Sequence, residues 1–525
     1  MSFLHAFLFS PRWNPLGWLL PALIGAVLLY INLDKGLLQY DEADYATAAR
    51  LGFRANYLDA TAIPTGEFFK KGARDVLLGE HGSLAKEIRE RHDINFYRHY
   101  HAPLMFYLLA IAGSLGGTSE MVFRIVALLS AVLIIPATYW SVRRVFGEQG
   151  KWIGFLSALL VAVSPMMYTT SVAISVHALY VALALMTVAA QARYFQTRRI
   201  RDFYIFAGLL ALAFLANEYA LFLLGACLLG FLLVPNDILS WQRGKLLVGC
   251  HFFGGMLLGA LVFFLLWPAG FLKLSAVKSY LFFAYFAFVK KELAYGSQSL
   301  AQICLSRFLA DPVEFIVIIF GAGFGLYGFL SKQLEKALLP LLIYPIVIFF
   351  VNLLNKAAFN TYVLSLYPLL LIFAAAGLVH WSQHQGRGGA VIRQRAVAIA
   401  MVAIAIGNIA FERFERREDV SPFRTAFQVL QSEGRHDDRV LVSFGYLPTV
   451  NYYLPEFDVY TIYLEDKPEE IAAKFEQRFY RYFIFFGKEN ELSAAPYGAA
   501  LDMNYREVRR IPNRQNKILI IFKSL

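Results

Sequence analysis

The chain contains little cysteine and little charge. Cysteine occurs three times in 525 residues, at Cys227, Cys250 and Cys304, without the spacing of a metal site or a disulfide framework. We interpret these cysteines as small packing residues. Charged residues make up 17% of the chain and hydrophobic residues 58%. This balance excludes a water-soluble globular protein of ordinary composition and indicates a polytopic membrane protein.

The basic residues do not point to a nucleic acid partner. The net charge is +11, but Lys and Arg form short clusters between apolar runs. Clusters of this kind set membrane topology, because cytoplasmic loops retain basic residues. The first apolar run, 15–33, follows Arg12 without a small-residue cleavage pattern. It is therefore predicted as an uncleaved span rather than a signal peptide.

Apolar runs long enough to cross a bilayer predict about eleven transmembrane helices. These runs are 15–33, 121–142, 152–168, 171–192, 203–217, 219–235, 246–268, 312–330, 337–354, 362–381 and 396–411. Basic clusters fall on alternate loops, which places loops 34–120 and 269–309, and everything after 411, on the extracytoplasmic face. The run 102–117 is short and ends in Gly-Gly, so we expect an interfacial helix there.

The last part of the chain has a different character. Short β-rich runs at 439–444, 458–463, 480–486 and 517–522 alternate with helical patterns at 421–434, 467–478 and 489–500. The sequence therefore predicts two domains, a transmembrane domain over 1–411 and a small extracytoplasmic α/β domain over 412–525. The tail has no glycine motif for nucleotides and no metal-ligand spacing.

Three carboxylates lie just beyond the first apolar run. Asp41, Glu42 and Asp44 begin an alanine-rich segment that ends in Arg50, the pattern of a helix with acids in its first turn. This pattern fits equally well a helix cap on a solvated loop and a general base held at the membrane surface.

A second polar stretch, 97–104, contains His99, Tyr100 and His101 in front of Pro103. One interpretation is an aromatic and basic anchor at the lipid headgroups, and another is a contact to phosphate. Two histidines near acids would also suit a divalent cation, but the sequence offers no spaced third ligand. We therefore expect no metal and no cofactor.

Other charged groups fall near membrane depth or on the outer face. Arg124, His177 and Glu218 lie in or beside apolar runs, where ionisable groups often mark a site. Snorkelling to the headgroups is the alternative for Arg124 and Glu218, and a neutral core role for His177. The loop 269–309 carries five basic residues, including Lys273 and Lys278. These lysines suit a phosphate carried on a membrane lipid, or anionic headgroups.

Several motifs occur in an order that resembles a known superfamily. In sequence they are the pair Asp41–Glu42, the stretch 97–104, Glu120 to Arg124, Arg-Arg-x-Phe-Gly at 143–147, and Lys356 followed by Tyr362 and by Tyr-Pro at 367–368. This series is similar to that of GT-C glycosyltransferases of the protein O-mannosyltransferase and aminoarabinose lipid A transferase type. No single motif is very specific, and the resemblance depends on their order and on their position relative to the spans.

The resemblance implies an inverting transfer of a sugar from a polyprenyl phosphate donor to a lipid, glycan or protein acceptor. It implies Asp41 as the base, with Glu42 either assisting it or binding the acceptor. It also implies a location in the bacterial inner membrane, with the site facing the periplasm. His101 stands where the family often has lysine, and His177 where many members have aspartate.

The resemblance and the charge pattern together give two groups of candidate site residues. We expect the donor phosphate to be bound by His101, Arg124, Lys356, Lys273 and Lys278. We expect the substrate pocket to include Tyr45, His99, Tyr100, His177, Glu218 and Tyr362.

Two other classes of protein remain open on the sequence. A transporter or flippase of lipid-linked glycans would also need charges near the membrane, but internal repeats with broken helices are not evident. A non-catalytic subunit of glycan assembly would work through the outer α/β domain.

Because the leaving group of the predicted transfer is a lipid phosphate, the chemistry does not require a metal.

Overall fold

The computed structural model describes most of the chain. The described residues are 16–31, 33, 36–50, 63–77, 101–147, 150–164, 173–234, 245–285, 299–310, 312–331, 335–355, 364–383, 420–443, 445–462, 466–513 and 516–525. The predicted span 396–411 and the candidate residues His99, Tyr100, Lys356 and Tyr362 lie outside them.

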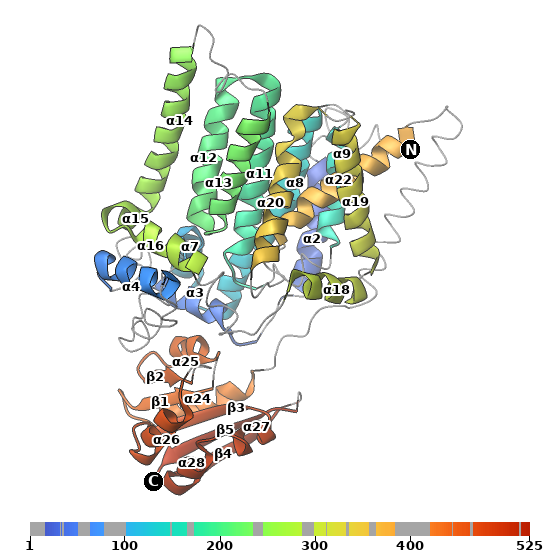
Figure 1. Cartoon of the computed structure of the whole chain (residues 1–525). Helices are drawn as coiled ribbons and strands as arrows, with labels where there is room; N and C mark the ends of the chain where they lie inside the picture. Colours follow the sequence, from blue (N-terminus) through green and yellow to red (C-terminus); the bar gives the residue numbers. More distant parts are fainter. Residues whose placement is uncertain are drawn as a thin grey trace.

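Apolar helices stand side by side and form the larger part of the molecule (Figure 1). They are α2 (Leu16–Ile31), α8 (Glu120–Phe146), α9 (Gly150–Ala162), α11 (His177–Thr197), α12 (Ile200–Ala216), α13 (Ala220–Leu233), α14 (Lys245–Leu266), α19 (Pro312–Leu330), α20 (Pro340–Leu354) and α22 (Tyr367–Gln383). Among the described residues, four stretches are long and apolar enough to cross a membrane, namely Glu120–Phe146, His177–Thr197, Gly249–Leu266 and Lys336–Leu354. The same residues include six shorter apolar helices of 10–17 residues. The total of eleven spans stays a prediction.

Helix α8 shows why this sequence forms a long helix through the bundle. Its 27 residues correspond to about 40 Å, more than the hydrocarbon thickness of a bilayer. Ser119 caps its start, Glu120 lies in the first turn, and Arg143 and Arg144 lie in the last turn. This order complements the helix dipole. Helix α8 packs against α2, α9 and α11, so it lies at the centre of the bundle.

Small residues let some of these helices approach closely. A Cβ atom added at Gly321 of α19 would lie 2.9 Å from the backbone nitrogen of Ala374 in α22. Close backbone approach of this kind is typical of helices that pack in membranes.

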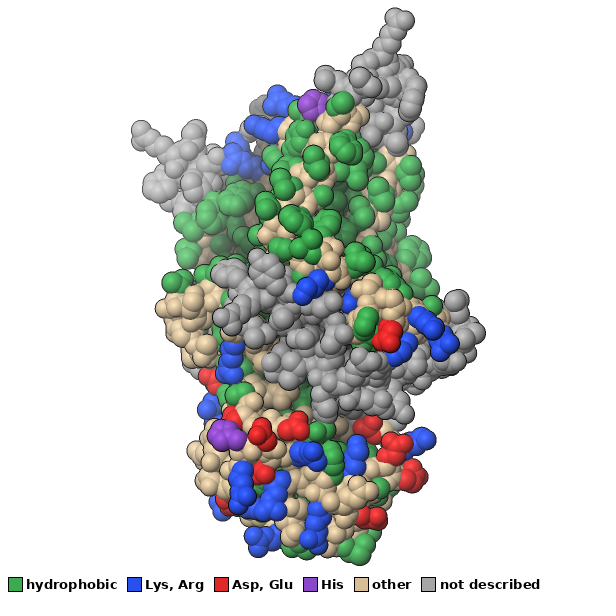
Figure 2. All heavy atoms as spheres, turned by 90° about the vertical axis from the view of Figure 1, so that its left-hand side faces the viewer, with side chains coloured by type: hydrophobic (Ala, Val, Ile, Leu, Met, Phe, Trp, Pro, Cys, Tyr) green, Lys and Arg blue, Asp and Glu red, His purple; other side chains and the backbone are tan. Residues whose placement is uncertain are grey.

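The outer surface of the bundle carries large exposed apolar side chains, such as Phe253 and Leu257 of α14. Figure 2 shows hydrophobic side chains over the helical bundle and charged side chains over the C-terminal domain.

Short helices gather at the end of the bundle that faces the C-terminal domain (Figure 1). They are α3 (Asp41–Arg50), α4 (Thr65–Leu77), α7 (Leu104–Gly116), α15 (Pro268–Leu272), α16 (Ser275–Tyr285) and α18 (Leu300–Ala310). The predicted loop 269–309 is thus largely helical in its described part. The predicted interfacial helix corresponds to α7, which packs against α3, α8 and α12.

The C-terminal domain is a five-stranded sheet with helices on both faces. Its elements are α24 (Pro422–Glu433), β1 (Arg439–Val442), α25 (Leu447–Tyr453), β2 (Asp458–Thr461), α26 (Pro468–Glu476), β3 (Tyr482–Gly487), α27 (Glu489–Ser493), α28 (Gly498–Asn504), β4 (Tyr505–Pro512) and β5 (Ile518–Ser524). The strand order is β2-β1-β3-β5-β4. Strand β1 runs parallel to β2 and β3, whereas β5 is antiparallel to β3 and β4.

The side-chain alternation of the strands divides this domain into two cores. Val440 packs with residues of α24 and α25 on one face, and its neighbour Leu441 packs with residues of α26 and α28 on the other. Strands β1 and β2 lie within predicted runs, and β3 and β5 overlap the other two and extend one and two residues beyond them. Strand β4 was not predicted, because it is an edge strand with several exposed charged residues and lacks a continuous apolar signal.

Candidate active site

Helix α3 presents Asp41 at the end of the bundle near the C-terminal domain. The preceding Tyr40 has a φ of +47°, and its carbonyl accepts a hydrogen bond from the amide of Ala43. Asp41 is exposed to solvent at the start of the helix. Crowding by the surrounding protein removes part of the water around its carboxyl and raises its pKa, the charge of His101 lowers the pKa, and Glu42 raises it again. The net pKa lies above the ordinary value of an aspartate, so Asp41 has the properties of an accessible base.

Glu42 occupies a different environment although it is the next residue. Its side chain is buried. Oε1 accepts the amide of Ile174 at 3.0 Å, while Oε2 accepts the amide of Gln39 and a guanidinium NH2 of Arg124, both at 3.3 Å. This network joins α3 to α8 and to the segment before α11. It favours a positioning role for Glu42 over the predicted direct part in proton transfer.

Arg124 is buried in α8, with 1% of its surface exposed, and holds the segment that leads into α3. The NH1 group of Arg124 donates to the carbonyl of Gly36 at 2.6 Å, and its NH2 group donates to the carbonyl of Leu37 at 3.1 Å and to Glu42. The sequence predicted Arg124 as a ligand of the donor phosphate. The structure instead surrounds the guanidinium with protein acceptors, which favours a positioning role here too.

His101 and Glu218 form a polar pair beside α3. Nδ1 of His101 lies 3.0 Å from Oε2 of Glu218, and the amide of Ala102 donates to Oε1 at 2.8 Å. Because a carboxylate only accepts, the hydrogen of this contact belongs to Nδ1. The ring of Tyr45 packs edge-on against His101, with a centroid distance of 5.4 Å. The structure therefore brings four candidates together, Asp41, Tyr45, His101 and Glu218.

The other described candidates are Lys278, Lys273 and His177. Lys278 is buried, and its Nζ donates to the carbonyl of Ile63 at 3.0 Å, which ties α16 to the start of α4. Lys273 is exposed at the end of α15. His177 was expected inside a span but is the first residue of α11. Its Nδ1 lies 3.3 Å from the side-chain Nδ2 of Asn217, the neighbour of Glu218. Over the described part of the chain, no group of three or more His, Cys, Asp or Glu has the arrangement of a metal site.

Some contacts near Asp41 were not anticipated from the sequence. Tyr452 and Tyr453 of α25 reach across from the C-terminal domain to α3 and to the start of α8. Local periodicity carries no signal for such contacts, because the partners are hundreds of positions apart.

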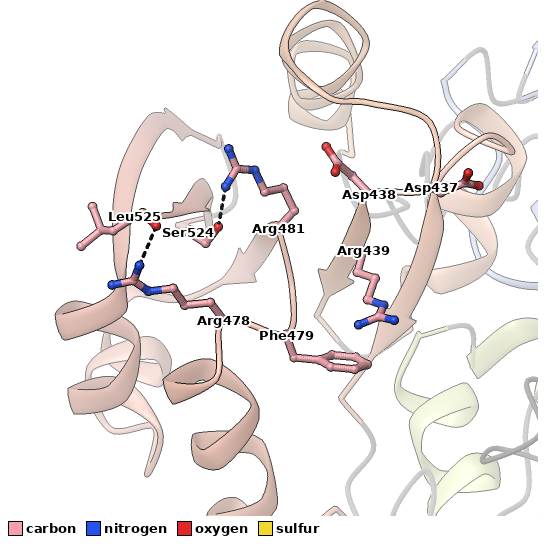
Figure 3. A pocket seen from close by; sticks show the side chains of 8 residues that line it. All are labelled: Asp437, Asp438, Arg439, Arg478, Phe479, Arg481, Ser524 and Leu525. Atoms are coloured by element: carbon pink, nitrogen blue, oxygen red, sulfur yellow. Dashed lines mark hydrogen bonds between the residues drawn. The ribbon is translucent and has the colours of Figure 1, made fainter.

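A hollow of about 410 Å³ lies elsewhere, at one edge of the C-terminal sheet (Figure 3). Its arginines already have partners in the protein. Arg478 donates to the carbonyl oxygen of Leu525 at 2.9 Å, Arg481 donates to Ser524 at 3.0 Å, and the guanidinium of Arg439 lies 4.2 Å from the ring centre of Phe479. None of the candidate site residues lines it. The group around Asp41 is therefore the better candidate for chemistry.

The pair of His101 and Glu218 leads to a stability prediction. Glu218→Gln keeps only one oxygen acceptor, whereas Glu218 uses one oxygen for Ala102 and the other for His101. We expect the free energy of unfolding to fall by about 1–3 kcal/mol, measured by thermal unfolding in detergent. Glu476→Gln, at an exposed site in α26, should change stability by less than about 0.5 kcal/mol. Equal stability of the two variants would contradict a structural role for the pair.

The fold is similar to those of several solved structures. It is similar to ArnT from Cupriavidus metallidurans bound to undecaprenyl phosphate, with a TM-score of 0.58 and 14% identity over 96% of this chain and 98% of that chain. It is also similar to the archaeal oligosaccharyltransferase AglB from Archaeoglobus fulgidus in complex with an inhibitory peptide and a dolichol-phosphate. There the TM-score is 0.62 and the identity 12%, over 98% of this chain and 74% of that chain. Arabinofuranosyltransferase AftD from Mycobacteria gives a TM-score of 0.53 at 14% identity, over 98% of this chain and 42% of that chain.

These proteins share the GT-C fold of membrane glycosyltransferases, and this chain has that fold. In addition, the model of the family described as dolichyl-phosphate-mannose-protein mannosyltransferase matches residues 100–267. The matched segment contains His101, Arg124, His177 and Glu218. A search of curated proteins finds no match. The predicted resemblance to GT-C glycosyltransferases is confirmed by this family match and by the fold.

Proposed function

We propose that the protein transfers a sugar from a polyprenyl phosphate donor to a lipid, glycan or protein acceptor, with Asp41 as the general base and with inversion at the sugar. The observation that carries this proposal is the state of Asp41. It is an accessible carboxyl group whose pKa is raised, and it interacts electrostatically with His101. It belongs to a fold in which solved structures hold undecaprenyl phosphate or a dolichol-phosphate.

The proposed step is a single displacement. The acceptor oxygen attacks the anomeric carbon from the face opposite the phosphate, a new C–O bond forms, and its proton moves to Asp41. The bond between the anomeric carbon and the phosphate oxygen breaks, and the electron pair leaves with the lipid phosphate. A base with a raised pKa suits this role, because proton transfer is favoured when the base is still ionised but not too weak.

A positively charged side chain is needed to balance the negative charge of the leaving lipid phosphate. His101 is the best placed of the described candidates, because Glu218 fixes the ring while the imidazole also interacts with Asp41. The exposed Lys273 is a second candidate. Positive groups fixed at the leaving oxygen act more strongly where water is excluded. The donor lipid phosphate supplies a stable leaving group, so we propose a reaction without a metal.

The location is proposed on the same basis as the topology. The family resemblance supports a bacterial inner membrane protein, and the alternation of basic loops in the sequence supports a site and a C-terminal domain that face the periplasm.

The transfer reaction is tested with the purified full-length protein in detergent or nanodiscs. Undecaprenyl phosphate sugars of several kinds are offered together with an envelope lipid and glycan extract. The proposal expects free undecaprenyl phosphate and an acceptor heavier by one sugar, detected by mass spectrometry. A transporter of lipid-linked glycans would move the donor between leaflets of a vesicle and leave it intact. That result, without release of lipid phosphate, would contradict the proposal.

The raised pKa of Asp41 gives a pH prediction. Protonated Asp41 is no base, so kcat/KM should fall as the pH drops through its pKa, with the midpoint above the ordinary value of about 3.9. A carboxyl with a raised pKa favours the folded state in acid and loses that contribution as the pH rises through the folded pKa. Asp41 therefore does not itself cause acid unfolding. Thermal unfolding at each pH serves as the control, and a flat rate profile down to pH 4 would contradict the assignment.

A further inference from the structure

We propose that the C-terminal domain is part of the catalytic apparatus, because Tyr453 and Tyr452 of α25 hold helix α3 and its Asp41 in place. This inference depends on the function proposed above. Both tyrosines are positioning residues, because they act through α3. The contacts that carry the inference lie at the two ends of α3 and at the start of α8.

Tyr453 joins the segment before Asp41 to the start of α8. Its hydroxyl accepts the amide hydrogen of Leu38 at 3.0 Å and donates to Oε1 of Glu120 at 2.8 Å. Leu38 lies three residues before Asp41, and the neighbouring carbonyl of Leu37 accepts from Arg124. Arg124 of α8 and Tyr453 of α25 thus fix the same short segment. Burial raises the pKa of Tyr453, the hydrogen bond from Leu38 lowers it and Glu120 raises it, so that the hydroxyl stays protonated and able to donate.

Tyr452 holds the other end of α3. The guanidinium carbon of Arg50 lies 3.8 Å from the centre of the Tyr452 ring, and the Arg50 NH1 group donates to the backbone carbonyl of Tyr452 at 2.8 Å. The Tyr452 hydroxyl donates to the carbonyl of Thr118, just before α8. Arg50 is the last residue of α3. Residues of α25 therefore hold the segment just before α3 and the last residue of α3.

The rings of both tyrosines also pack in hydrophobic cores, which fixes the positions of their hydroxyl groups. Tyr452 is 2% exposed and shares a core with Ala43, Tyr45 and Phe106. The ring of Tyr453 stacks on Phe427 of α24 at a centroid distance of 5.1 Å. The core around α3 thus continues into the C-terminal domain. A shift of that domain would move α3, and with it Asp41, relative to His101.

Small displacements of a base are costly, since a misplacement of about 1 Å can reduce a rate by about 100-fold. Tyr453→Phe removes the hydroxyl while keeping the ring that stacks on Phe427. We expect kcat to fall about tenfold, with KM for the donor changed by less than about twofold. The backbone amides of residues 37–50 should exchange with deuterium at least about fivefold faster, because the Leu38 anchor is lost.

Tyr505→Phe is the matched control. The Tyr505 hydroxyl donates to the carbonyl of Tyr480 at 2.6 Å, within the core on the other face of the sheet. This variant loses a comparable hydrogen bond in the same domain but none to α3. It should leave kcat and the exchange of residues 37–50 at wild-type values, even when its melting temperature falls as much as that of Tyr453→Phe.

The two readouts separate the inference from the function on which it depends. Unchanged exchange over 37–50 in Tyr453→Phe overturns the inference, and so does faster exchange with an unchanged kcat. Equal losses of kcat in Tyr453→Phe and Tyr505→Phe overturn it as well, because they indicate general destabilisation. Absence of sugar transfer in the wild-type protein overturns the proposed function, whereas hydrogen exchange still decides whether α25 holds α3.

Discussion

Asp41→Asn should reduce sugar transfer from a polyprenyl phosphate donor by about 10²–10⁴-fold, the usual contribution of a general base. The asparagine keeps the size and polarity of the side chain but cannot accept the proton of the acceptor. Donor binding, measured with undecaprenyl phosphate by microscale thermophoresis or a filter assay, should change by less than about threefold, because proton acceptance contributes to the transition state and not to donor binding.

Asp44→Asn is the control for this prediction, because Asp44 also lies in the first turn of α3 and carries the same charge. It should retain activity within about fivefold of wild type. Stability separates a chemical role from a structural one. The raised pKa means that partial loss of water around the carboxyl disfavours ionised Asp41, so Asp41→Asn should not lower the melting temperature at neutral pH. Wild-type transfer by Asp41→Asn would falsify its assignment as the base.

Arg124→Met should produce the largest loss of stability, about 3–5 kcal/mol, because it leaves the buried carboxylate of Glu42 without its cation. It also removes the donors to the carbonyls of Gly36 and Leu37, so the segment before α3 loses its anchor on α8. The loss is measured by thermal or denaturant unfolding in detergent. Arg201→Met, at an exposed position of α12, should change stability by less than about 0.5 kcal/mol.

A double-mutant cycle isolates the charge pair. Glu42→Gln combined with Arg124→Met removes both buried charges, so the double variant should be more stable than the sum of the two single losses predicts. Additive losses would mean that the two side chains do not depend on each other. Undecaprenyl phosphate binding to Arg124→Met, under conditions where it stays folded, tests the original expectation that Arg124 contacts the phosphate. If Arg124→Met loses far more affinity for undecaprenyl phosphate than Glu42→Gln does, Arg124 does contact the phosphate.

Much of the architecture was predictable because it depends on local patterns. Apolar runs predicted helices, and each of the predicted spans that the structure describes overlaps a helix. Alternating runs predicted β1, β2, β3 and β5, whereas the charged edge strand β4 gave no comparable signal. The acids at 41–44 were correctly predicted to begin a helix, because acids in a first turn and alanine behind them are a local pattern.

The individual roles within the site were harder to predict. Asp41 and Glu42 are adjacent and chemically alike, yet the first is exposed and the second is buried against Arg124. Which of them faces solvent depends on what packs against α3. Likewise, Lys278 was expected to face a lipid phosphate, but it lies buried with its Nζ bonded to the carbonyl of Ile63.

The sequence by itself determined the membrane character of this protein, the alternation of strands and helices in its tail, and the acidic start of α3. These properties follow from hydropathy and periodicity, which are read over a few neighbouring residues. Only the tertiary structure decided that Asp41 lies beside His101, that Glu42 and Arg124 form a buried pair, and that α25 holds α3. Leu38 and Tyr453, for example, are 415 positions apart. Contacts of this kind depend on the packing of whole domains, which no local pattern encodes.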